Sequence, residues 1–259
     1  MTNPDIEFES AFYNIEKTRR SLEQFDKITT SFFENTACRS VVYSDADTGN
    51  KTYKIVLEDN IPISARDAMS GAIADLRHAL DMAMCATFKI VKGKDAPKML
   101  YFPAGNSAGD VRGKLDVFDF PDYVTMYLSS LQLHPALDEA SPPNNHLLCE
   151  LITAAREKHR VACAPDAKIT GAGIRVGAKD VICMRIPPRW DSSKQEVEVG
   201  TVGPEGHFDY DYHLTFEVVF TDAGPLTGRP VRQTIFELCQ TCDAVVSELK
   251  LMCTEHTPR

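Results

Sequence analysis

The chain has 259 residues, enough for a large core, and its 28 Lys and Arg against 37 Asp and Glu residues give a net charge of −9. The acidic residues are spread along the chain, so its overall field does not favour nucleic acid. No run approaches the length of about 18 apolar residues that a membrane span needs, and no export signal is recognisable. We therefore expect a globular cytoplasmic protein with no nucleic-acid or membrane partner, whose eight cysteines are reduced.

The first half of the chain alternates helical and strand-like patterns. A helix is predicted over 5–34, where apolar residues recur at steps of three and four. Strand-like runs at 38–44 and 51–59 flank Asp, Gly and Asn residues that supply a hairpin turn. A second long helix follows over 63–90. Its apolar stripe, expected in the core, consists of Ala65, Met69, Ala72, Ile73, Leu76, Leu80, Ala83 and Thr87.

Two opposite charges lie beside that stripe. Arg77 and Asp81 are four residues apart, so they lie one turn above each other on a helix. A charge at the edge of a core needs a partner, because burying it unpaired costs several kcal/mol. The spacing therefore predicts a half-buried ion pair. Asp75 and His78, three apart on the same helix, have the spacing for a local pair at the surface.

Three further helices are expected before the pattern changes. Short helices are predicted over 107–117 and 121–133, and a third long helix over 144–163. His159 lies on the apolar line of that last helix, so its imidazole should point inward and bind a carboxylate, with Asp81 as the candidate. The candidate site is a cluster of Arg77, Asp81, Lys158 and His159. It is either a buried network that fixes helix register or a ligand-binding or catalytic site.

From about residue 165 the period changes to two. Strands are predicted at 174–176, 180–186, 194–202 and 207–222, and the glycines of 171–177 predict a turn. These strands indicate an antiparallel sheet, because the last of them alternates cleanly between aromatic and polar residues.

A final apolar-sided helix over 231–253 is expected to cover the inner face of this sheet. The predicted fold is therefore α+β: a long-helix bundle with an inserted β-hairpin, followed by an antiparallel sheet covered by a C-terminal helix. Residues 1–165 would form the helical part and 166–259 the sheet with its helix, sharing one core.

Two other motifs have the spacing of metal or redox sites. CQTC at 239–242 has Cys253 and His256 downstream, but a redox pair belongs at a helix N-terminus and this one is predicted inside a helix. Core packing is the preferred interpretation. The second motif alternates on one strand face, where a solvated surface is the preferred interpretation; it consists of His207, Asp209, Asp211 and His213. No metal and no cofactor is expected.

The segment SGAIADLRHALDMAM at 70–84 resembles the GDALHNLRSALDHLA motif of a family of uncharacterised bacterial proteins. That family also has a Phe-Pro loop and a later Lys-His-Arg segment, matched here at 102–103 and 158–160. The resemblance covers roughly residues 5–163. The chain departs from the motif at three polar positions, where Ala74, Asp75 and Met82 replace His, Asn and His.

The family's arginine with a histidine five places later is similar to the Arg-x4-6-His motif of HEPN domains, some of which are metal-independent ribonucleases. In those enzymes the two residues serve transesterification at the RNA 2′-hydroxyl. Met82 stands at the histidine position here and cannot transfer a proton. The resemblance therefore implies a HEPN-like scaffold without that catalysis.

The sequence thus predicts a non-catalytic binding or interaction protein with a HEPN-like helical part. Its partner would be a small molecule or a protein, and an oligomer is left open. The alternative is an RNA-directed enzyme, a HEPN-like ribonuclease in which Arg77 and His159 act together.

Overall fold

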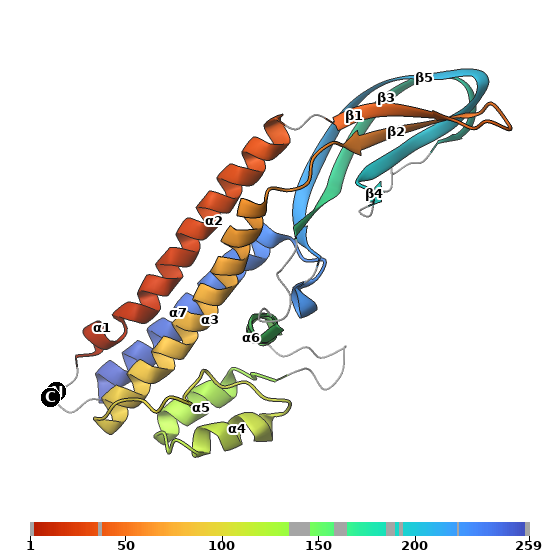
Figure 1. The fold of residues 1–259 in the computed structure, drawn as a ribbon. Coiled ribbons are helices and arrows are strands. Elements are labelled where there is room, and N and C mark those ends of the chain that lie inside the picture. The colour runs from red at the N-terminus through yellow and green to blue at the C-terminus, as the bar shows by residue number, and fades with distance from the viewer. Residues whose placement is uncertain are drawn as a thin grey trace.

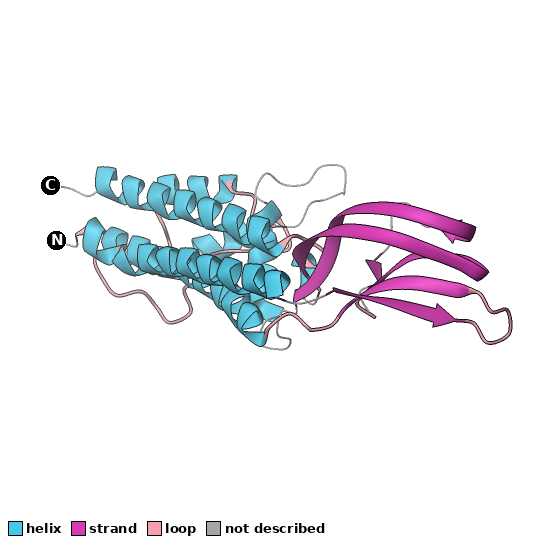
Figure 2. Ribbon diagram, turned by 90° about the horizontal axis from the view of Figure 1, so that it is seen from above, coloured by secondary structure: helices cyan, strands magenta, loops and turns pink. Residues whose placement is uncertain are grey.

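The structure is a computed structural model and describes residues 3–35, 38–134, 146–157, 165–184, 190–191, 194–221 and 223–256. Long helices lie side by side in a bundle, and an antiparallel sheet extends from one end of it (Figure 1). Figure 2 shows the same division from above, with helices at one end of the molecule and strands at the other. None of the helices in the described ranges combines the length and the apolar character of a membrane-crossing segment.

Three helices form the bundle: α2 (Glu9–Asn35), α3 (Ile63–Lys92) and α7 (Val231–His256), with the short α1 (Pro4–Glu7) before them. All eight residues of the stripe predicted on α3 are fully buried, which confirms that this face packs in the core. Small residues in the stripe let the neighbouring helices approach closely. α3 ends where Gly93 adopts a left-handed conformation and its N–H binds the Lys89 carbonyl.

The sheet is built from both halves of the chain. Its strands are β1 (Cys38–Ser44), β2 (Lys51–Leu57), β3 (Pro165–Met184), β4 (Trp190–Asp191) and β5 (Glu196–Phe220). The order is β1-β2-β5-β3, β4 pairs with β5, and every pairing is antiparallel. The predicted hairpin is confirmed, and its second strand pairs with the first part of β5.

Two predictions for the sheet were wrong. Residues 171–177 form no turn but lie inside β3. The strand predicted at 174–176 and the described residues 180–184 of the strand predicted at 180–186 belong to the same β3. The two strands predicted at 194–202 and 207–222 are likewise joined in one continuous β5, which begins at Glu196 and ends at Phe220. Glycine backbone groups still pair with the neighbouring strand, and β-bulges along the β3 and β5 ladder absorb the irregularities.

Three shorter helices lie beside the bundle (Figure 1). α4 (Ala108–Asp116) and α5 (Asp122–Ser130) confirm the two short helices predicted there. The Ser107 hydroxyl caps α4 by accepting the Asp110 N–H at 3.2 Å. α6 (His146–Glu157) is the described part of the third predicted helix, and a single 3-10 turn, η1 (Gly224–Leu226), follows β5.

The C-terminal helix α7 contacts the sheet region, but it packs more extensively on α3 and α2. Its buried side belongs to the same core as those two helices, and Val218 and Phe220 at the end of β5 join that core. The sheet extends past the bundle, so α7 reaches only its nearer end (Figure 1). The α+β class is confirmed. The stretches 1–165 and 166–259 interleave in space, because one supplies a hairpin to the sheet and the other a helix to the bundle.

Candidate functional site

Arg77 and Asp81 form a two-point ion pair on α3. Arg77 Nε lies 3.1 Å from Asp81 Oδ2, and Nη2 lies 3.0 Å from Oδ1. Each side chain is 16% exposed, so the pair lies at the edge of the core, as its position beside the apolar stripe predicts. Such fork-like geometry is the strongest form of an arginine-carboxylate contact. The predicted contact between the two residues is confirmed.

The same pair binds the backbone of Phe102. The Phe102 N–H donates to Asp81 Oδ1 at 2.7 Å, and Arg77 Nη2 donates to the Phe102 carbonyl at 3.2 Å. Both polar groups of one residue are therefore satisfied by the ion pair, which fixes the Phe-Pro segment against α3. The sequence marked the pair and the Phe-Pro dipeptide as separate features. Nothing in the sequence indicated that the ion pair hydrogen-bonds to the Phe-Pro segment.

A cavity of about 650 Å³ lies beside this pair, between α3, the segment 99–104 and the end of α4. Ligand sites commonly occupy about 300 to 1,000 Å³, so its size is that of a small-molecule site. Its floor consists of buried apolar side chains, among them Met84, Leu100, Phe102, Leu115 and Ile152. Arg77 and Asp81 form part of its wall.

The rim of the cavity is apolar and exposed. Met99, Tyr101 and Val117 line it, with exposed fractions of 75%, 54% and 76%. Single exposed apolar residues are ordinary, but three around the mouth of one cavity form a patch. The cavity thus combines a buried apolar floor, a charged wall and an apolar entrance.

Lys114 is the third charged residue of the cavity wall. Its ammonium donates to the Ala104 carbonyl and lies 3.6 Å from the Asp110 carboxylate. Sequence reasoning missed this residue. The available signal was its place on a short amphipathic helix, beside the buried Val111 and Leu115.

The structure tests only part of the predicted cluster. Arg77 and Asp81 come together, whereas Lys158 and His159 lie outside the described residues. The predicted surface pair of Asp75 and His78 was wrong. Asp75 is buried and accepts a 2.8 Å bond from Lys17 on α2, while His78 is exposed. Helix packing turned Asp75 toward α2 and away from its neighbour on the same helix.

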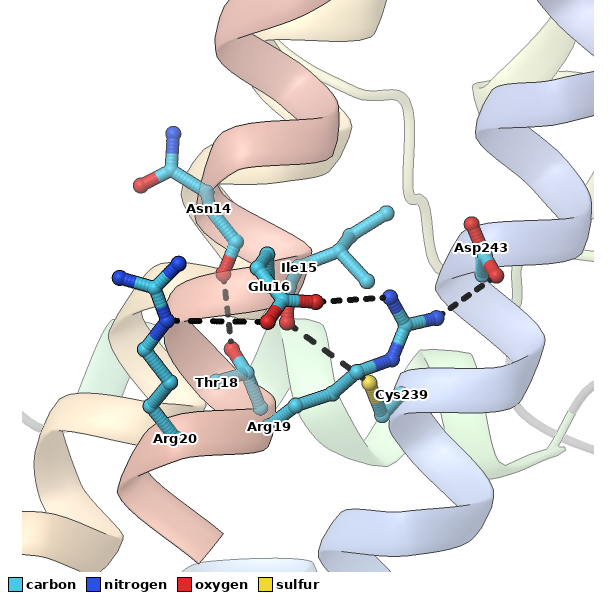
Figure 3. A network of polar contacts seen from close by, with 8 residues as sticks. All are labelled: Asn14, Ile15, Glu16, Thr18, Arg19, Arg20, Cys239 and Asp243. Atoms are coloured by element: carbon cyan, nitrogen blue, oxygen red, sulfur yellow. Dashed lines mark hydrogen bonds and ion pairs between the residues drawn. The ribbon is translucent and has the colours of Figure 1, made fainter.

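A second polar network joins α2 to α7 (Figure 3). On α2, Arg19 Nη1 donates to Glu16 Oε2 of the same helix at 3.3 Å. Its Nη2 donates to Asp243 Oδ2 on α7 at 2.8 Å. Because Arg19 and Asp243 are more than a third exposed, their pair contributes only about 0 to 1 kcal/mol. We interpret this network as a surface link between two helices.

Cys239 of the CQTC sequence lies in that network, and its thiol approaches the Ile15 carbonyl at 3.9 Å (Figure 3). Cys239 and Cys242 are both buried and lie well inside α7, as predicted. Burial raises the pKa of both thiols, which keeps them protonated. Neither has the lowered pKa of a redox thiol.

The described residues contain no group of three His, Cys, Asp or Glu side chains that could hold a metal ion. His207 of the alternating strand motif is exposed. The side chains of Asp209, Asp211 and His213 lie outside the described part of the chain.

No protein-family model, curated protein or solved structure matches this chain. The cavity beside Arg77 and Asp81 is therefore interpreted from its own geometry.

Proposed function

We propose that this protein binds a small, largely apolar molecule in the cavity beside Arg77 and Asp81, without changing it chemically. One observation carries the proposal: a cavity of small-molecule size has a buried apolar floor, a charged wall and an exposed apolar rim. The apolar lining supplies affinity by burial, and the charged wall supplies orientation.

The state of the ion pair supports binding over catalysis. Arg77 and Asp81 direct their hydrogen bonds at each other and at the Phe102 backbone, which is the role of groups that maintain a structure. Met82, at the histidine position of the HEPN motif, packs against the core. The HEPN-like ribonuclease remains a hypothesis, and no contact among the described residues favours it over ligand binding.

The proposal predicts that the uncharged fluorophore N-phenyl-1-naphthylamine binds the protein with enhanced, blue-shifted emission, because the cavity lining is largely apolar. Leu115→Trp places a large ring in the floor and should weaken binding about tenfold or more. Leu251→Trp on the exposed side of α7 is the matched control and should bind as the parent does. Fluorescence titration of the parent and the two tryptophan variants measures the affinity of each for the fluorophore. Equal binding by the two tryptophan variants would refute the proposed site.

Leu115→Trp could lose binding because it misfolds, since overpacking a core costs about 1 to 3 kcal/mol of stability. A substitution at the exposed rim of the cavity avoids this problem. Val117→Asp places a charge at the entrance without touching the core, because Val117 is exposed. It should also weaken fluorophore binding. Met126→Asp should not, because Met126 is an exposed apolar residue on α5 outside the cavity lining.

A further inference from the structure

One edge of the sheet is open. β1 is the end strand of the order β1-β2-β5-β3, so among the described strands it pairs with β2 alone. The sheet extends past the helical bundle, and β1 makes no extensive contact with any described element except β2 (Figure 1). An edge strand presents a row of unpaired N–H and C=O groups, which is a template for pairing with another strand.

The hydrogen-bond pattern shows which residues of β1 direct their backbone groups to the open edge. The Asp45 N–H donates to the Asn50 carbonyl at 2.8 Å, so Asp45 faces the second strand of the hairpin. At the other end, Leu57 donates its N–H to the Gln195 carbonyl at 2.9 Å, away from β1. The direction alternates with each residue of an antiparallel ladder. The residues whose backbone groups face the open edge are therefore Ser40, Val42 and Ser44.

β1 lacks the features that protect the edges of natural sheets, which are proline, lysine and β-bulges. The opposite edge strand, β3, has all of them. It begins at Pro165, it contains the exposed Lys179, and its ladder with β5 shifts register at three places. β1 contains no proline or lysine, and it pairs with β2 in continuous register. Its Val42 and Tyr43 are exposed.

The sequence of β1 is complementary to itself in antiparallel order. If two copies are aligned with Val42 opposite Val42, the backbone groups that face the open edges meet in hydrogen-bonded positions. The flanking positions then pair two hydroxyls, a branched apolar residue with an aromatic ring, and two opposite charges: Ser40 with Ser44, Val41 with Tyr43, and Arg39 with Asp45. Cross-strand pairs of these kinds are favourable, and a two-fold axis forms each of them twice.

The two charges select this orientation. Arg39 contacts Glu58 of its own chain at 3.1 Å, and the Asp45 carboxylate accepts the turn N–H groups of Asp47 and Thr48. Arg39 and Asp45 are both exposed all the same, so a second partner has access to each. They lie toward opposite ends of the strand. Antiparallel copies therefore bring opposite charges together, whereas parallel copies would bring like charges together.

From these observations we propose that β1 is a dimerisation edge. A second copy of this chain adds its own β1 in antiparallel orientation, and the two sheets become one continuous sheet across a two-fold axis. The proposal is independent of the cavity and of what the cavity binds. A seam of two seven-residue strands buries little surface, so the dimer is expected to be weak and to depend on protein concentration.

Sedimentation velocity at increasing protein concentration tests the proposal. The parent should change from monomer to dimer. Val42→Lys places two like charges opposite each other on the two-fold axis and should weaken dimerisation about tenfold or more. Val181→Lys is the matched control, because Val181 on the opposite edge strand is 44% exposed and Val42 is 47% exposed. It should dimerise as the parent does, and circular dichroism should show that all three proteins are folded.

Val42→Cys locates the seam without weakening it. Residues opposite each other at a hydrogen-bonded position have Cα atoms about 5.5 Å apart, which a disulfide can span. Mild oxidation should therefore give a covalent dimer whose disulfide joins residue 42 to residue 42, and Val181→Cys should give no such dimer through residue 181. A parent that stays monomeric at every concentration would overturn the proposal. Dimerisation of Val42→Lys equal to that of the parent, or a dimeric Val42→Cys protein without the disulfide at residue 42, would also overturn it.

Discussion

Phe102→Ala is expected to lower the free energy of unfolding by about 4 kcal/mol, because it removes a large aromatic ring from the core. Phe102 is 1% exposed and belongs to the main core of the helical bundle. Its backbone contacts with Arg77 and Asp81 do not depend on the side chain, so the substitution isolates the packing contribution. Denaturant-induced unfolding followed by circular dichroism measures the change.

Tyr101→Ala is the control for this prediction. Tyr101 is the neighbouring aromatic residue of the same segment, but it is 54% exposed, and its removal should cost about 0.5 kcal/mol or less. A Phe102→Ala protein as stable as the Tyr101→Ala protein would show that the segment does not pack on α3 as described.

Asp81→Ala should lower the free energy of unfolding by about 3 kcal/mol. The change leaves the half-buried Arg77 without its carboxylate and the Phe102 N–H without its acceptor. Arg112 and Asp116 on α4 offer a matched pair, with the same residue types at the same spacing but with both side chains more than half exposed. Asp116→Ala should therefore cost only about 0.5 kcal/mol or less. Equal thermal stability of the parent and the Asp81→Ala protein would rule out a structural role for the pair.

A double substitution tests whether the cost of Asp81→Ala comes from the unpaired charge of Arg77. Arg77→Met combined with Asp81→Leu leaves no unpaired charge, so it should be more stable than Asp81→Ala alone. A double variant no more stable than Asp81→Ala would contradict the view that the unpaired charge of Arg77 causes the loss of stability.

The helices and the hairpin could be predicted because their patterns are local. The stripe on α3 repeats at helical steps over its whole length, and the strands on either side of the hairpin turn are short and uninterrupted. The two long strands could not be predicted as continuous. Glycines at 171–177 and a Gly-Pro-Glu-Gly run at 203–206 have the composition of turns. The first run is extended because it pairs with β5, and the second lies inside β5 between the paired residues Val202 and His207.

The charged pair of the site could be predicted, but the cavity could not. Arg77 and Asp81 lie on a strongly periodic helix, where spacing alone places them beside the core. The cavity depends on where the segment 99–104 lies, and a segment without periodic pattern gives no indication of its path. Lys114 belongs to the site only because that segment passes beside α4.

Photoaffinity labelling tests the central claim, that this cavity binds a molecule with an apolar chain, most directly. Methyl dodecanoate carrying a diazirine at the end of its chain would be photolysed with the protein, and the labelled peptides would be identified by mass spectrometry. We predict that the label falls within residues 99–118, at the rim of the cavity, and that excess methyl dodecanoate removes it. Label on the strands of the sheet, or label that excess methyl dodecanoate does not displace, would contradict the account.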